Sequence, residues 1–239
     1  MQKSEEETFA KAIEMGAVTH ADPRCAVSVA IVSGLVRSLC RNETSKDVEV
    51  DALIERAWGY MAKTHPDSKL DRAEFEKHAY AKTLDSLVLC DPGMGYVYKC
   101  LGSSLWCLRQ VLTRQETFKS SMTKLVMCAG DADTNGAVAG GLMGALYGYK
   151  NLPREWKEGL KYEGWYMDKI SVLCEIASLV ERGDYCADKD KDTQLDGGKG
   201  FLTSEQMKER EMEVMTKMLM ADQHRREEER TEANVWEFC

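Results

Sequence analysis

The sequence has little of what β-sheet and membrane proteins require. Its 239 residues include 4 prolines and 5 phenylalanines against 13 methionines, and runs of β-branched residues are few, which favours an all-α fold. The longest apolar runs, residues 26–36 and 136–149, are shorter than the roughly 18 to 20 residues that cross a membrane. We therefore expect no transmembrane segment.

The chain also lacks an excess of positive charge. Its 32 Lys and Arg residues face 40 Asp and Glu residues, which gives a net charge of −8. Phosphate binding by polynucleotides or anionic lipids needs clustered positive charge. We expect no direct nucleic-acid partner and no membrane partner.

Paired cysteines are absent as well. No two of the nine cysteines form a C-x-x-C pair, which disfavours a zinc site. An odd number of scattered thiols fits a reducing compartment, and the opening MQKSEEETF has no apolar signal core. These features predict an intracellular, cytoplasmic protein.

Helical periodicity and short turns predict a compact bundle. Ser4 with Glu7 has the spacing of a capping box, and Asp22 followed by Pro23 has the pattern of an N-cap and a first helical position. Further helices are expected at residues 50–61, 70–89, 96–112, 116–127, 136–148 and 165–180. We expect one domain over residues 1–182, a charged loop over 183–203, and a polar helix and tail over 204–239.

The segment GDADTNGAVAGGLMGALYG, residues 130–148, carries the clearest chemical signal. Gly136, Gly140, Gly144 and Gly148 fall four apart, and each interior glycine costs about 0.5 to 1 kcal/mol relative to alanine. We therefore expect neighbouring helices to approach closely and place this helix at the domain centre. Asp131, Asp133 and Thr134 precede it. One Asp suffices for a helix cap, whereas two carboxylates and a hydroxyl are also ligands that Mg²⁺ or Mn²⁺ prefers. The spacing leaves capping and metal binding both open.

Three sequence blocks carry a resemblance to a known family. GDADTN, followed by GAVAGGLMGALYG and LPREW, resembles the C-terminal signature of the ADP-ribosylglycohydrolase family. THADPR at residues 19–24 and GYVYK at residues 95–99 resemble two further blocks, in family order. The resemblance implies a compact all-α, multi-helix bundle and Mg²⁺-dependent hydrolysis of the bond at C1″ of ADP-ribose, on modified proteins or in poly(ADP-ribose).

The resemblance also implies which residues form the site. Three of them would be ligands of the family's two Mg²⁺ ions: Asp131, Asp133 and Thr134. His20 would face the bound ADP-ribose, and Gly95 and Tyr96 would line its pocket. From the residues alone, His20 could also be a structural hydrogen-bonding group and Tyr96 a core residue.

The chain departs from the family pattern ahead of Thr19. An early family segment supplies Thr-Asp-Asp metal ligands and a catalytic acidic residue, but this sequence has no Asp-Asp dipeptide. We therefore expect an N-terminally shortened member with a partial, weak metal site, no assignable catalytic residue, and uncovered apolar surface available for self-association. Two functions stay open: a hydrolase of ADP-ribosyl bonds, and a non-catalytic ADP-ribose-binding or crystallin-like structural relative.

Overall fold

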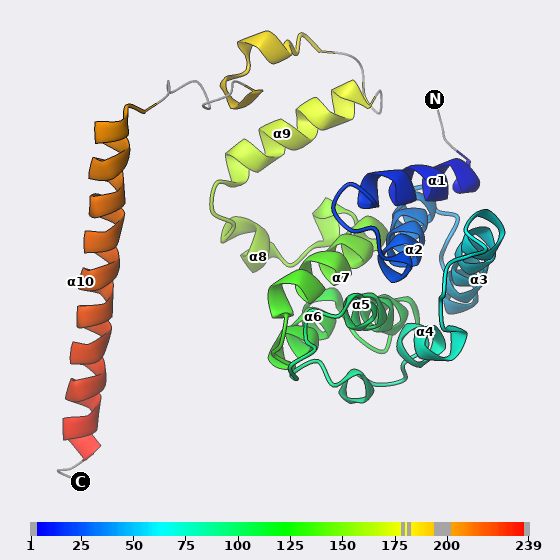
Figure 1. The fold of residues 1–239 in the computed structure, drawn as a ribbon, viewed down its shortest axis with the longest axis horizontal. Coiled ribbons are helices and arrows are strands. Elements are labelled where there is room, and N and C mark those ends of the chain that lie inside the picture. Colours follow the sequence, from blue (N-terminus) through cyan, green and yellow to red (C-terminus); the bar gives the residue numbers. More distant parts are fainter. Residues whose placement is uncertain (1–3, 178–179, 181–182, 194–201, 237–239) are drawn as a thin grey trace. The chain divides into compact units, whose positions relative to one another are not determined.

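The structure is a computed structural model that describes residues 4–177, 180, 183–193 and 202–236, with side chains as far as residue 226. Within these residues the regular secondary structure is helical and contains no strand, so the all-α prediction is confirmed. The chain divides into two compact units, Met1–Glu163 and Gly164–Cys239 (Figure 1).

Helices joined by short connections build the first unit. They are α1 (Glu5–Gly16), α2 (Pro23–Cys40), α3 (Asp47–Thr64), α4 (Arg72–Ala79), α5 (Val97–Leu112), α6 (Phe118–Met127), α7 (Ala132–Tyr147) and α8 (Arg154–Glu158), with the 3₁₀ turns η1 (Asp85–Leu87) and η2 (Tyr149–Asn151). The second unit holds α9 (Glu163–Ile176), the short turns η3 (Ala187–Lys189) and η4 (Lys191–Thr193), and α10 (Ser204–Trp236).

The first two helices begin where their capping residues predict. The Glu7 amide donates to Ser4 Oγ at 3.2 Å and the Ser4 amide donates to Glu7 Oε2 at 2.7 Å, which completes the capping box of α1. Asp22 is the N-cap of α2, accepts the Arg24 amide at 2.8 Å, and precedes Pro23 at the first position. Both predicted helix starts are confirmed.

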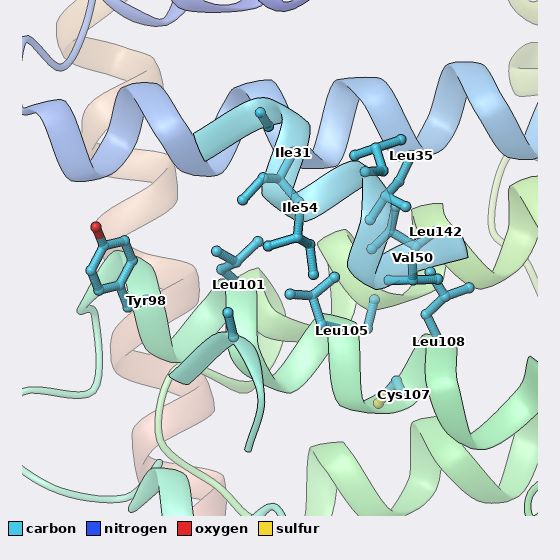
Figure 2. Close-up of a cluster of buried hydrophobic side chains, with 14 of the residues drawn as sticks. Ile31, Leu35, Val50, Ile54, Tyr98, Leu101, Leu105, Cys107, Leu108 and Leu142 are labelled. Atoms are coloured by element: carbon cyan, nitrogen blue, oxygen red, sulfur yellow. The ribbon is translucent and has the colours of Figure 1, made fainter. Parts of the chain in front are cut away.

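Helices α2, α5 and α7 contact one another and form the centre of the first unit (Figure 1). Figure 2 shows their buried side chains, with Ile31 and Leu35 from α2, Leu101 and Leu105 from α5, and Leu142 from α7 in one cluster. Burying each such side chain contributes about 1.5 to 3 kcal/mol. This packing fixes the relative positions of the loops that precede the three helices.

Helix α2 is the one helix of the described residues that is long and apolar enough to cross a membrane. Core helices pass the same test, and 44% of α2 is buried inside the protein. Its apolar side chains pack against α1, α3, α5 and α7. The burial therefore favours a role as a core helix of the first unit.

The predicted helix over residues 70–89 is wrong in its second half, because α4 ends at Ala79. Two side chains from α5 bond to carbonyl oxygens at and beyond that end. Arg109 Nη1 donates to the Ala79 carbonyl at 2.7 Å, and Trp106 Nε1 donates to the Lys82 carbonyl at 3.1 Å. These bonds between segments satisfy carbonyls that would otherwise accept helical bonds, so the chain turns there.

Helix α7 is central on one side alone, which corrects the expectation drawn from its glycines. Ala139, Leu142 and Met143 are buried, but a Cβ atom built on Gly141 or Gly144 would meet no atom within 4 Å. Within the described part of the first unit, no helix packs closely against these two glycines. Self-association through this uncovered surface stays a prediction.

The second unit contains the helix expected over residues 165–180, here α9, and none of the residues of α9 is buried. Its Lys169 ammonium instead pairs with Asp190 at 2.7 Å and Asp192 at 2.6 Å. The division between units falls at residues 163 and 164, ahead of the limit of residue 182 expected from the sequence.

Candidate functional site

The loops ahead of α2, α5 and α7 meet at a pocket of about 450 Å³. Five of the six residues singled out in the sequence line it: His20, Gly95, Tyr96, Asp131 and Thr134. These residues come from three separate segments of the chain. His20 precedes Gly95 by 75 positions, and Tyr96 precedes Asp131 by 35 positions. The sixth, Asp133, is exposed on the first turn of α7 and is not among the lining residues.

The loop that carries His20 is held by the end of α1. The Gly16 carbonyl accepts the His20 amide at 2.9 Å and the Thr19 hydroxyl at 3.3 Å. The imidazole Nδ1 lies 3.0 Å from Thr19 Oγ1. Since His20 is exposed, this neighbour orients the ring without burying it.

The next residues form an ion pair at the pocket wall. Asp22 accepts from Arg24 twice, with Nε to Oδ1 at 3.0 Å and Nη2 to Oδ2 at 2.6 Å. The Arg24 side chain and then its amide lower the pKa of Asp22 to about 2, and Asp22 and then the Tyr96 hydroxyl raise the pKa of Arg24. The Arg24 guanidinium carbon lies 5.4 Å from the centre of the Tyr96 ring. Both charged groups are therefore ionised and fixed side by side.

Tyr96 is anchored from the other direction by α4. Its hydroxyl donates to Glu74 Oε1 at 2.7 Å, and its ring makes edge contacts with His78 and Tyr98 at centroid distances of 5.5 and 5.4 Å. Burial first, and then Glu74, raise the pKa of Tyr96 to about 12. At neutral pH the group is therefore a phenol whose ring position is set by its neighbours.

A buried lysine holds the loop that leads to Gly95. Lys99 is 7% exposed and donates from Nζ to Asp91 Oδ1 at 2.6 Å and to the Val88 carbonyl at 2.7 Å. The same Asp91 oxygen accepts the Gly93 amide at 2.7 Å. Lys99 in particular lowers the pKa of Asp91. These bonds fold residues 91–95 into one position beside the pocket.

The turn before α7 brings Asp131 to the same place. Gly130 adopts φ +69°, and a Cβ at this position would lie 2.2 Å from the Leu89 carbonyl oxygen. This contact requires glycine and joins the turn to residues 89–90. On the far side, Asp131 Oδ2 lies 4.0 Å from an ideal Cβ on Gly95. Asp131 therefore borders the loop that presents Tyr96.

The two carboxylates of the acidic motif differ in what they bond. Asp131 is the N-cap residue of α7 by position, but its side chain makes no capping hydrogen bond. The pKa of Asp133 is lowered, first by the Thr134 amide and next by a hydrogen bond with the Asp131 carboxyl group. The bond from the Thr134 amide is a helix-capping contact of Asp133. Asp131 makes no such contact, so capping does not account for its carboxylate.

The charge of Asp131 also acts on a neighbouring thiol. Cys100, on the first turn of α5, lines the pocket and donates from Sγ to the Thr134 carbonyl at 3.9 Å. Burial first, and then Asp131, raise the pKa of Cys100 to about 11. The pocket thus has an acidic side chain, Asp131, on one wall, and the guanidinium of Arg24 supplies a positive charge on another.

The acidic motif before and at the start of α7 has the type of oxygen ligands that divalent cations bind. Asp131, Asp133 and Thr134 offer carboxylate and hydroxyl oxygens, the ligand type that Mg²⁺ selects. Among the described residues no group of three or more His, Cys, Asp or Glu side chains is placed to hold a metal ion. The residues present therefore fit one part of a coordination shell.

Sequence reasoning missed Arg24 as a member of the site and treated Asp22 as a cap alone. Both residues line the pocket. The sequence does contain one indication. Asp22, an acidic N-cap, lies two positions before Arg24 at the start of an apolar helix, and this spacing permits the two bonds that Arg24 donates to the Asp22 carboxylate. Sequence spacing could not show that Tyr96 would lie under that arginine.

Comparisons with known proteins agree with the resemblance. The ADP-ribosylglycohydrolase family profile matches residues 1–188. No solved structure matches the chain.

Several curated proteins are similar over shorter segments. An ADP-ribosyl-[dinitrogen reductase] glycohydrolase of Rhodospirillum rubrum is 41% identical over 66 residues, 27% of this chain and 22% of that protein. ADP-ribosylarginine hydrolases Tri1 of Serratia proteamaculans and Pseudomonas putida are 29% and 38% identical, over 39% and 38% of this chain and 22% and 23% of their own lengths. The matched segments thus span about a fifth of these relatives. The chain belongs to the ADP-ribosylglycohydrolase family.

Proposed function

We propose that the pocket between α2, α5 and α7 binds ADP-ribose, and that the chain acts in hydrolysis of the glycosidic bond at C1″ of ADP-ribose on modified proteins. One observation carries the proposal. The loops with His20, with Gly95 and Tyr96, and with Asp131, far apart in sequence, line one pocket of about 450 Å³. That volume lies within the range of small-molecule sites.

Each wall of the pocket suits a different part of such a ligand. Tyr96 offers an aromatic ring of fixed position, and the exposed His20 offers an imidazole ring. Asp131 and Thr134 offer oxygens that can accept from or bind to ribose hydroxyl groups. The packed helices and the bonds at Gly16, Glu74 and Lys99 hold these groups before a ligand arrives, which reduces the ordering cost of binding.

We also propose a divalent-cation site at the acidic wall, formed by Asp131, Asp133 and Thr134. When bound, Mg²⁺ would supply positive charge that orients ribose hydroxyl groups and a water molecule near C1″. The side chain of Asp131 is available because it caps no backbone amide. Since these residues offer two carboxylates and one hydroxyl, we expect the cation to bind weakly on its own and more tightly with ADP-ribose.

An arginine-linked substrate is the first to test, because two of the relatives are named ADP-ribosylarginine hydrolases. Calorimetric titration with ADP-ribose, with and without Mg²⁺, measures recognition. Release of ADP-ribose from an ADP-ribosylated arginine peptide measures hydrolysis. We expect saturable binding that Mg²⁺ strengthens, and we expect Asp131→Asn to remove the Mg²⁺ effect while leaving the fold intact.

The same titrations test a second candidate, a non-catalytic ADP-ribose-binding protein. One structural observation favours it: among the described residues the acidic wall lacks a third carboxylate, histidine or cysteine for a metal. Binding of ADP-ribose without any release from the peptide supports this second function. If ADP-ribose gives no heat of binding either with Mg²⁺ or without it, both candidate functions are contradicted.

A further inference from the structure

Arg24 has a distinct position in the charge distribution of the pocket. Among the described residues that line the pocket, it is the one Lys or Arg side chain. The wall formed by Asp131 and Thr134 repels phosphate groups by its negative charge, so an anionic ligand group is best placed at the Arg24 wall. ADP-ribose carries both ribose hydroxyls and a diphosphate.

The guanidinium of Arg24 is held by one edge. Asp22 bonds to Nε and Nη2, which uses two of the five N–H donors of an arginine. The opposite edge, formed by Nη1 and the second hydrogen of Nη2, has the fork geometry that matches two phosphate oxygens. The Arg24 side chain is 42% exposed, so a ligand in the pocket can reach it.

Its contacts also fix the guanidinium plane before binding. Asp22 accepts from Nε and Nη2, the guanidinium carbon lies 5.4 Å from the centre of the Tyr96 ring, and Glu74 accepts from the Tyr96 hydroxyl. A flexible arginine loses rotamer freedom when it binds an anion, whereas a fixed one has lost it on folding. Asp22, Tyr96 and Glu74 therefore do more than neutralise the charge of Arg24, because they also fix its guanidinium group before an anion binds.

We propose that Arg24 recognises the diphosphate of the ligand through the guanidinium edge that Asp22 leaves available, and so selects phosphate-bearing ligands. This inference rests on the proposed function, since it assigns a part of ADP-ribose to one wall of that pocket. It makes Arg24 a specificity-determining residue, and it makes Asp22 and Tyr96 positioning residues for it.

The test compares two probes that differ in phosphate, ADP-ribose and adenosine, by calorimetry and by competition. We expect Arg24→Gln to weaken ADP-ribose binding about 10- to 100-fold, the effect of a lost charged hydrogen bond, and adenosine binding less than about threefold. Arg24→Lys keeps the charge but loses the fork, and should give an intermediate loss. Arg154→Gln, outside the pocket on α8, is the matched control and should change neither affinity.

Each outcome decides a separate point. Equal losses for both probes would show that Arg24 only supports the pocket, and unchanged ADP-ribose binding would show that it does not contact phosphate; either result overturns this inference. Wild-type protein that binds neither probe contradicts the proposed function instead. Thermal melting confirms that each variant folds, and if Arg24→Gln does not fold, the same comparison is made with Arg24→Lys.

Discussion

Gly130 and Leu89 are in such close contact that a Cβ on the glycine would lie 2.2 Å from the leucine carbonyl oxygen. The glycine also has φ +69°, a backbone conformation that residues other than glycine rarely adopt. This contact joins the turn before α7 to the segment that leads into the Gly95 loop. It therefore determines where Asp131 lies relative to Tyr96.

Replacing Gly130 by alanine should be costly. The left-handed backbone adds about 1 to 2 kcal/mol, and the backbone contact adds about 1 to 3 kcal/mol more. We expect Gly130→Ala to lower the free energy of unfolding by about 2 to 5 kcal/mol, measured by urea denaturation. The matched control is Gly144→Ala, where the added Cβ meets nothing within 4 Å; it should raise stability by about 0.5 to 1 kcal/mol. Equal effects of the two substitutions would contradict the contact.

The pair Lys99 and Asp91 should respond asymmetrically to substitution. Lys99 has a side chain that is 9% exposed, whereas the Asp91 side chain is 35% exposed. Asp91→Ala leaves a buried ammonium with the Val88 carbonyl as its remaining partner and should cost about 2 to 4 kcal/mol. Lys99→Met leaves a carboxylate that water can solvate and should cost less. Urea denaturation of both variants checks the order, and the reverse order would be inconsistent with this burial.

Asp22 should contribute to stability in a defined pH range. Its folded pKa of about 2 lies below the ordinary value of 3.8, so folding favours the ionised form. The stabilisation is complete above about pH 4 and is lost as the pH falls toward 2. We expect the difference in Tm between wild type and Asp22→Asn to be constant from pH 7 to pH 5 and to shrink below pH 4.

Arg24 provides the control for this pH dependence, because it is the largest cause of the lowered pKa of Asp22. In an Arg24→Gln background the Asp22→Asn substitution should give a smaller Tm difference with a weaker dependence on pH. If the pH dependence stays the same without Arg24, the ion pair is not its source.

Local chemistry allowed some helices to be predicted well. Ser4 with Glu7, and Asp22 with Pro23, mark helix starts through bonds within one turn, so the sequence itself contains both partners. The end of α4 could not be predicted in this way. Its carbonyls bond to Arg109, which is 30 positions later in the chain, and periodicity contains no such information.

The candidate site shows the same division. Family order drew attention to His20, Tyr96 and Asp131, and the packing of α2, α5 and α7 brings their loops together. The glycines of α7 were misjudged, because glycine spacing permits a close helix contact but does not require one. Arg24 was missed because its importance depends on a ring that follows it by 72 positions.

Thiols around the pocket allow the central claim to be tested without assuming that the chain is catalytic. Cys25 and Cys100 line the pocket and are partly buried, whereas Cys40 is exposed at the other end of α2, about 22 Å along the helix from Cys25. All three thiols are free, so each reports its own accessibility to an alkylating reagent.

The decisive measurement is the alkylation rate of each cysteine, followed by mass spectrometry at mildly alkaline pH with and without ADP-ribose. If ADP-ribose occupies this pocket, saturating ligand should slow alkylation of Cys25 and Cys100 at least about fivefold and leave Cys40 unchanged. Unchanged rates at Cys25 and Cys100 under conditions where calorimetry shows binding would place the ligand elsewhere and contradict the account.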